Sequence, residues 1–82
     1  MIKGGSDMKP KLFGVYKHFK GNRYRVLEIA QHTETDEIMV IYQEVGNPRY
    51  PVWARPLSMF NEEVEVDGKL VPRFEYMGGG LD

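Results

Sequence analysis

The stretch RYRVLEIAQHTETDEIMVIYQE (residues 23–44) decides the fold. Its two halves, 23–32 and 37–44, are each long enough for a strand, and the second is rich in β-branched residues, which favour extended strands. Between them, the Thr, Glu and Asp side chains of residues 33–36 can bond to nearby backbone groups and so favour a turn. Both halves carry apolar side chains on both faces, whereas a flat sheet with one wet face would alternate more cleanly. The stretch therefore predicts two long antiparallel strands in a strongly curved sheet.

The other predicted elements are short. They are a first strand over residues 12–19, a fourth strand over 52–55, one helical turn over 56–60, and a hairpin of 63–66 with 69–74. Pro56 suits the first position of a helical turn, where no amide donor is needed. Asp67-Gly68 favours the positive φ angles of a two-residue hairpin turn. Five to six strands with one short helical turn predict an all-β protein, specifically a small SH3-like antiparallel barrel.

Length and composition limit the class of protein. A chain of 82 residues fits one domain, and because it contains no cysteine, disulfides and thiolate metal sites are excluded. We expect a flexible leader over residues 1–9, a single β-barrel domain over 10–76 and a disordered tail over 77–82. No apolar run is long enough for a transmembrane helix, and the amino terminus lacks the apolar stretch of a signal peptide. We therefore expect a cytoplasmic protein that does not contact a membrane.

The net charge of −1 hides an uneven distribution of charge along the chain. Residues 1–25 contain seven Lys or Arg and one acid, whereas residues 26–48 contain five acids and no Lys or Arg. Such charges can simply pair across neighbouring strands. Alternatively, the basic first hairpin forms a nucleic-acid footprint with a stacking ring. The residues of that alternative are Lys17, Lys20, Arg23, Arg25 and Tyr24.

The ends of the predicted strands carry side chains suited to ligand binding. Arg55 follows Trp53 by two positions, so on a strand both side chains share a face. There the guanidinium can stack on the indole or hold a carboxylate or phosphate. A closed barrel would bring His32 and Arg55 into one concave site, with Glu34 orienting one of them. The candidate ligand-binding residues are Arg55, His32, Trp53, His18, Tyr16, Tyr42 and Glu34.

Each candidate also has a structural interpretation. Arg55 could bridge to Glu34 or Glu28 and lock the barrel, and the two histidines could be hydrogen-bonded residues at strand ends. The tyrosines could belong to the core, with their hydroxyls reaching water or backbone. Because Trp53 lies between two apolar neighbours, we expect its indole to be largely buried. Its replacement by alanine is then expected to cost roughly 3–5 kcal/mol.

No catalytic motif accompanies these residues. The serines lack a nucleophile motif, and the histidines with Glu34 lack the close spacing of a zinc site. We therefore expect a protein that is not an enzyme and that holds neither cofactor nor metal. The favoured interpretation is a non-catalytic binding module that holds a peptide or small anionic ligand near Trp53 and Arg55. The alternative is a nucleic-acid-associated accessory domain that uses the basic first hairpin, and only this alternative predicts a steep salt dependence.

Four segments resemble, in order and approximate spacing, a small bacterial family known as domain of unknown function 1653. They are 14–21 with Tyr24, then 30–35, 40–43 and 53–60. The resemblance covers roughly residues 12–75, and the loop over 44–51 departs from the Leu-Tyr-Gly stretch of the family. The resemblance implies an SH3-like β-barrel and supplies no activity.

Overall fold

The computed structural model describes residues 8–47, 49 and 51–81, so most of the leader expected over 1–9 lies outside the described residues. The elements follow in the order β1 (Gly14–His18), β2 (Arg23–Gln31), β3 (Ile38–Glu44), β4 (Trp53–Pro56), α1 (Leu57–Phe60), β5 (Glu63–Val66), β6 (Lys69–Pro72) and β7 (Phe74–Gly79). All recorded strand pairs are antiparallel. The all-β class predicted from the sequence is confirmed, although the last predicted strand is divided into β6 and β7.

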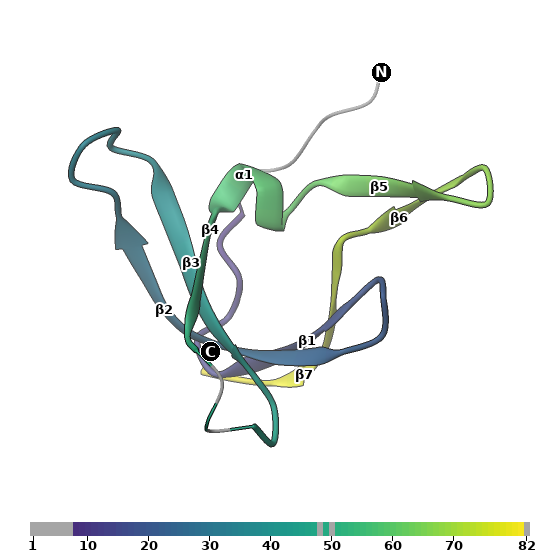
Figure 1. Ribbon diagram of the computed structural model, residues 1–82, viewed down its shortest axis with the longest axis horizontal. Coiled ribbons are helices and arrows are strands. Elements are labelled where there is room, and N and C mark those ends of the chain that lie inside the picture. Colours follow the sequence, from purple (N-terminus) through teal and green to yellow (C-terminus); the bar gives the residue numbers. More distant parts are fainter. Residues whose placement is uncertain (1–7, 48, 50, 82) are drawn as a thin grey trace.

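Five strands form one strongly bent sheet in the order β4-β3-β2-β1-β7, and β5 and β6 form a separate two-stranded sheet (Figure 1). The register shifts between Val26 and Glu28 of β2, and such an irregularity bends a strand and increases its twist. The larger sheet is not closed into the predicted barrel. Within the described residues, β4 and β7 remain its two edges. Side chains span this gap instead, because the guanidinium of Arg55 lies 5.6 Å from the centre of the Phe74 ring.

The core lies between the concave face of this sheet and α1. It consists of Tyr16, Val26, Val40, Tyr42, Leu57, Phe60 and Phe74. Leu57 and Phe60 come from the single helical turn, which places both of them against the sheet. Phe60 stacks on Phe74 with ring centres 4.2 Å apart, and both Tyr16 and Tyr42 contact Phe60 edge-on. Aromatic rings therefore supply much of the buried area of this small domain.

The C-terminal segment is ordered further along the chain than predicted. Instead of a disordered tail over 77–82, β7 continues to Gly79, which pairs with Gly14, and the Leu81 amide donates to the Leu12 carbonyl at 2.9 Å. Gly80 has a φ of +97°, and a Cβ there would lie 2.9 Å from the Leu12 oxygen. The glycines thus permit a close approach of two backbone segments, which gives residues 77–81 a defined path, whereas residue 82 of the predicted tail lies outside the described residues.

The β5–β6 hairpin extends from the end of α1 on the side of the β1–β2 turn (Figure 1), and its residues Val66, Val71 and Pro72 line a pocket together with His18. Its turn residues Asp67 and Gly68 have φ angles of +51° and +79°, as a two-residue hairpin turn requires. At its base, the Arg73 amide donates to the Glu62 carbonyl at 3.0 Å, and the two side chains form an ion pair. The described part of the chain contains no helix long and apolar enough to cross a membrane.

Candidate ligand-binding cleft

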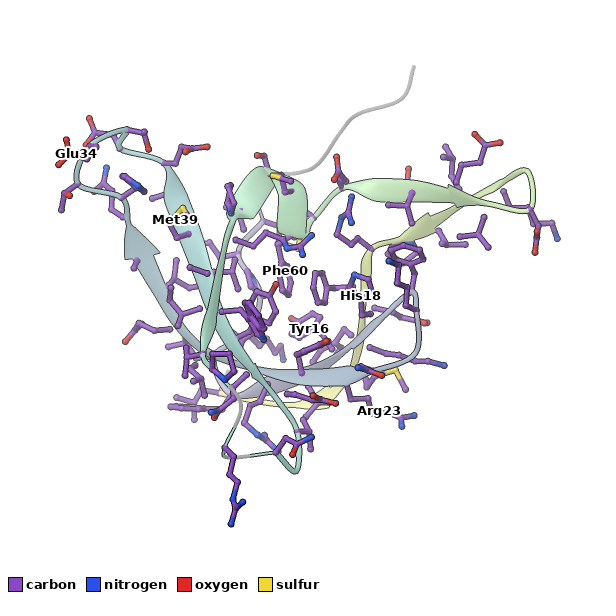
Figure 2. All side chains as sticks on the ribbon, viewed as in Figure 1. Tyr16, His18, Arg23, Glu34, Met39 and Phe60 are labelled. Atoms are coloured by element: carbon purple, nitrogen blue, oxygen red, sulfur yellow. The ribbon has the colours of Figure 1, made fainter. Side chains whose placement is uncertain are left out.

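A cleft opens beside the gap between the edge strands β4 and β7. It has a volume of about 390 Å³ and is lined by His18, Tyr24, Tyr42, Glu44, Pro51, Trp53, Arg55 and Phe74. We refer to it as the Trp53–Arg55 cleft. Figure 2 shows the labelled His18, Tyr16 and Phe60 pointing into the space between the bent sheet and α1. The cleft is thus an outward continuation of the aromatic core.

Strand register explains why these side chains meet. The directly opposed pairs are Trp53 with Tyr42, Arg55 with Val40, Tyr24 with Glu44, and His18 with Phe74. The side chains of directly opposed residues project from the same face of a sheet, and so do the side chains of every second residue along one strand. Because Val40 and Tyr42 are buried in the core, their face is the inner one. The same face therefore provides both the core and the walls of the cleft.

Arg55 is held in place by aromatic side chains. Its Nε donates a hydrogen bond to the Tyr42 hydroxyl at 3.1 Å, and its guanidinium lies over the ring of Phe74. Within the described residues no carboxylate forms an ion pair with Arg55, so the predicted bridge to Glu28 or Glu34 is not present. The other guanidinium N–H groups of this half-buried side chain are therefore available to a ligand.

Trp53 is not the buried residue that the sequence predicts. Its side chain is 49% exposed, whereas the opposed Tyr42 is 5% exposed. The physical reason is the position of β4, which is an edge strand with a neighbour on one side only. Tyr42 fills the buried position of that pair, and Trp53 closes the outer wall of the cleft. A half-exposed indole beside an arginine is a suitable contact for a ligand.

His18 lines the cleft where β1 pairs with β7. Its Nδ1 accepts a hydrogen bond from the Lys20 amide at 3.2 Å, and its ring packs edge-on against Phe74 at 4.9 Å. Partial burial lowers the pKa of His18 below the ordinary 6.5, and the positive charges of Arg55, Arg73 and Lys20 lower this pKa further. The lowered pKa of His18 favours the neutral imidazole at pH 7. Because Nδ1 accepts a hydrogen bond, the proton is assigned to Nε2, which is a donor.

His32 and Glu34 do not belong to this cleft. Both lie in the turn between β2 and β3, where the His32 Nδ1 accepts hydrogen bonds from the amides of Glu34 at 3.0 Å and Thr35 at 3.3 Å. Figure 2 shows Glu34 at the tip of that hairpin, far from His18. The prediction that His32 and Arg55 share one concave site, with Glu34 orienting one of them, is therefore wrong. The turn and the cleft lie at opposite ends of β2, a strand of nine residues.

The remaining candidates divide between core and cleft. Tyr16 is buried, accepts a hydrogen bond from the Lys11 amide at 3.0 Å and does not line the cleft. Tyr42 is equally buried but forms part of the cleft wall. Sequence reasoning missed three lining residues, which are Glu44, Pro51 and Phe74. Glu44 stands two positions after Tyr42, so the two-residue period of a strand could have identified it. Phe74 reaches the cleft only through the pairing of β7 with β1, and this pairing leaves no local signal in the sequence.

The basic residues of the nucleic-acid alternative are separated from their stacking ring. Lys17 is directly opposed to Arg23, whereas Tyr24 is opposed to Tyr16 and lines the cleft. Lys17 and Arg23 thus lie on the outer face of the β1–β2 pair and Tyr24 on the inner face, whereas Lys20 lies in the turn between the two strands, over the ring of Phe19. Arg25, also on the outer face, donates from Nη1 to the Phe13 carbonyl at 2.7 Å. In the described part of the chain, no group of three or more His, Asp or Glu is placed to hold a metal ion.

Comparison with known proteins gives a family and a related structure. The family model described as "Protein of unknown function (DUF1653)" matches residues 14–76, a range that contains every residue lining the cleft. A crystal structure of a DUF1653 protein from Bordetella bronchiseptica is similar, with 36% sequence identity and a TM-score of 0.74. The alignment covers 93% of this chain and 95% of that chain. No curated protein matches this chain.

Proposed function

We propose that this chain, which belongs to the DUF1653 family of proteins of unknown function, is a non-catalytic binding module. Its ligand is a peptide or a small anion held against Trp53 and Arg55. The observation that supports this proposal is a half-buried guanidinium that lines a cleft and has no carboxylate partner within the described residues. Partial burial of a charge is costly unless a counter-charge is supplied. A bound anion supplies it.

The surroundings of Arg55 support an anionic ligand. The hydrogen bond to Tyr42 and the contact with Phe74 fix the orientation of the guanidinium before any ligand arrives. A fixed guanidinium loses less side-chain entropy on binding and presents a planar fork to a carboxylate or phosphate. His18, whose neutral form is favoured, adds an N–H donor at the same cleft, and the cations that lower its pKa also attract an anion.

The shape of the cleft supports a ligand of limited size. A volume of about 390 Å³ with aromatic walls and few polar groups is typical of a site for a small molecule or a short peptide segment. The unpaired edge of β4 could additionally accept an extended peptide as a further strand. An SH3-like architecture and a cytoplasmic location belong to the same proposal. The position of α1 between β4 and the last strands supports the architecture.

The test uses the single tryptophan as a reporter, because Trp53 lines the cleft. Benzoate, acetate and inorganic phosphate are titrated while the fluorescence of Trp53 is recorded. Arg55→Lys keeps the charge but loses the fork, so we expect affinity for the bound anion to fall about tenfold. Arg23→Lys, on the outer face, is the matched control and should leave affinity unchanged. Equal affinities of the two variants for every anion would contradict the proposal.

Nucleic-acid binding remains the alternative proposal, and the shared outer face of Lys17, Arg23 and Arg25 is the observation that favours it. Binding of a single-stranded oligonucleotide through these cations would weaken steeply between low and moderate salt. Charge reversal by Arg23→Glu would then abolish binding, whereas Trp53→Ala would leave it intact. The opposite pattern supports the cleft.

A further inference from the structure

Glu44 gives the Trp53–Arg55 cleft a second charge, of opposite sign. It stands at the end of β3, directly opposed to Tyr24, and its half-buried side chain lines the cleft. Within the described residues its carboxylate forms neither an ion pair nor a hydrogen bond. Sequence reasoning did not select Glu44, and the anion proposal alone has no use for it, because a carboxylate repels an anionic ligand.

The two charges of the cleft are kept apart by the strand register. Arg55 is opposed to Val40, and Glu44 lies four residues further along β3. At about 3.3 Å per residue, their backbone positions are separated by roughly 13 Å along the strand. Both side chains line the same cleft, so a molecule that carries an anionic and a cationic group can contact both of them. No direct ion pair joins them.

Aromatic rings line the cleft beside both charges. Trp53 is opposed to Tyr42, which stands midway between Val40 and Glu44 on β3, and Tyr24 is the direct neighbour of Glu44. Aromatic faces attract ammonium groups by cation–π interaction, most strongly where water is displaced. The end of the cleft near Glu44 therefore suits a cation, whereas the end near Arg55 suits a carboxylate.

We infer that the ligand of this cleft is a small zwitterion, with its carboxylate on the fork of Arg55 and its ammonium between Glu44 and the rings of Tyr24 and Trp53. Free amino acids and betaines are the chemical class with both groups on one short body. A ligand of this class satisfies both unpartnered charges at once. This inference rests on the proposed function and narrows the anionic ligand to a molecule without net charge.

The test compares three molecules that share the same apolar benzyl side chain and differ in their charges. They are phenylalanine, which is a zwitterion, N-acetylphenylalanine, which is an anion, and phenylalaninamide, which is a cation. Each is titrated into the full-length protein, and the indole N–H signal of Trp53 is followed by NMR. Loss of one charge-assisted contact should weaken binding about tenfold, so the zwitterion should bind more tightly than either derivative.

Glu44→Gln is the decisive variant, because it removes the charge and keeps the size of the side chain. It should weaken binding of phenylalanine to the level of N-acetylphenylalanine while leaving the affinity for N-acetylphenylalanine the same or higher. Glu34→Gln, in the distant β2–β3 turn, is the matched control and should change neither affinity. Unfolding midpoints of both variants should stay close to that of the wild type, which excludes a loss of fold.

The outcomes separate the inference from the proposed function. If N-acetylphenylalanine binds wild type as tightly as phenylalanine does, or if Glu44→Gln weakens both equally, the zwitterion inference is overturned and the anion module survives. If neither carboxylate compound shifts the Trp53 signal, both fail. If only phenylalaninamide binds, the cleft is a cation cage, which overturns both as well.

Discussion

Trp53→Ala should separate the stability of the protein from ligand binding. Removing a fully buried tryptophan typically costs about 3–5 kcal/mol. Because the Trp53 side chain is 49% exposed, roughly half of that loss applies, or about 1.5–2.5 kcal/mol. For a domain of this size, each kcal/mol lowers the melting temperature by about 4–8 °C. The variant should therefore remain folded at room temperature while its affinity for the ligand of the cleft is lost.

Phe60→Ala is the control for this prediction. Phe60 is 2% exposed and stacks on Phe74, so its removal should cost about 3–5 kcal/mol, a large part of the usual total of about 5–15 kcal/mol. Urea unfolding followed by circular dichroism measures both variants without relying on the tryptophan signal. If Trp53→Ala destabilises the protein as much as Phe60→Ala does, Trp53 is a core residue and the outer wall of the cleft has been misassigned.

Two further predictions concern His18 and the C-terminal glycines. The folded state keeps the pKa of His18 below 6.5, mainly by burial and then through Arg55, so the unfolded chain takes up the proton more readily. The free energy of unfolding should therefore fall as the pH drops below about 6.5 and through the folded pKa, and His18→Asn should flatten this part of the profile. An unchanged slope would exclude His18 as the cause. Gly80→Ala should lower the melting temperature more than Gly21→Ala, because both have positive φ but only the Cβ at position 80 meets the Leu12 oxygen. Similar losses would show that the backbone approach is not tight.

Most of the fold could be predicted from local patterns. The β2–β3 pair and the Asp67-Gly68 hairpin follow from β-propensity and turn chemistry, which act over a few residues. Closure of the sheet could not be predicted in this way, because it depends on whether distant edges reach each other. The glycines near residue 80 were equally ambiguous, since glycine serves both mobile chain and close backbone contact.

The candidate site was predictable only in part, because it combines strand ends that are far apart in sequence. Trp53 and Arg55 share a face through the two-residue period of a strand, and this prediction needs no tertiary information. The choice between His18 and His32 requires knowing which strands pair beside each histidine. Both histidines stand next to a turn in the sequence, and only the pairing of β1 with β7, which opposes His18 to Phe74, places one of them in the cleft.

The hydrogen bond between the Arg73 amide and the Glu62 carbonyl has a consequence for engineering. It joins the two positions where the β5–β6 hairpin leaves and rejoins the rest of the chain. The two ends of the segment 63–72 therefore lie next to each other. No residue of this segment lines the Trp53–Arg55 cleft. Because Val66, Val71 and Pro72 of this segment line a second pocket together with His18, the segment is best kept, and a fluorophore or surface tether could be attached at its Asp67-Gly68 tip. The protein thereby offers an attachment point remote from the cleft, from which ligand capture can be followed without occupying the cleft itself.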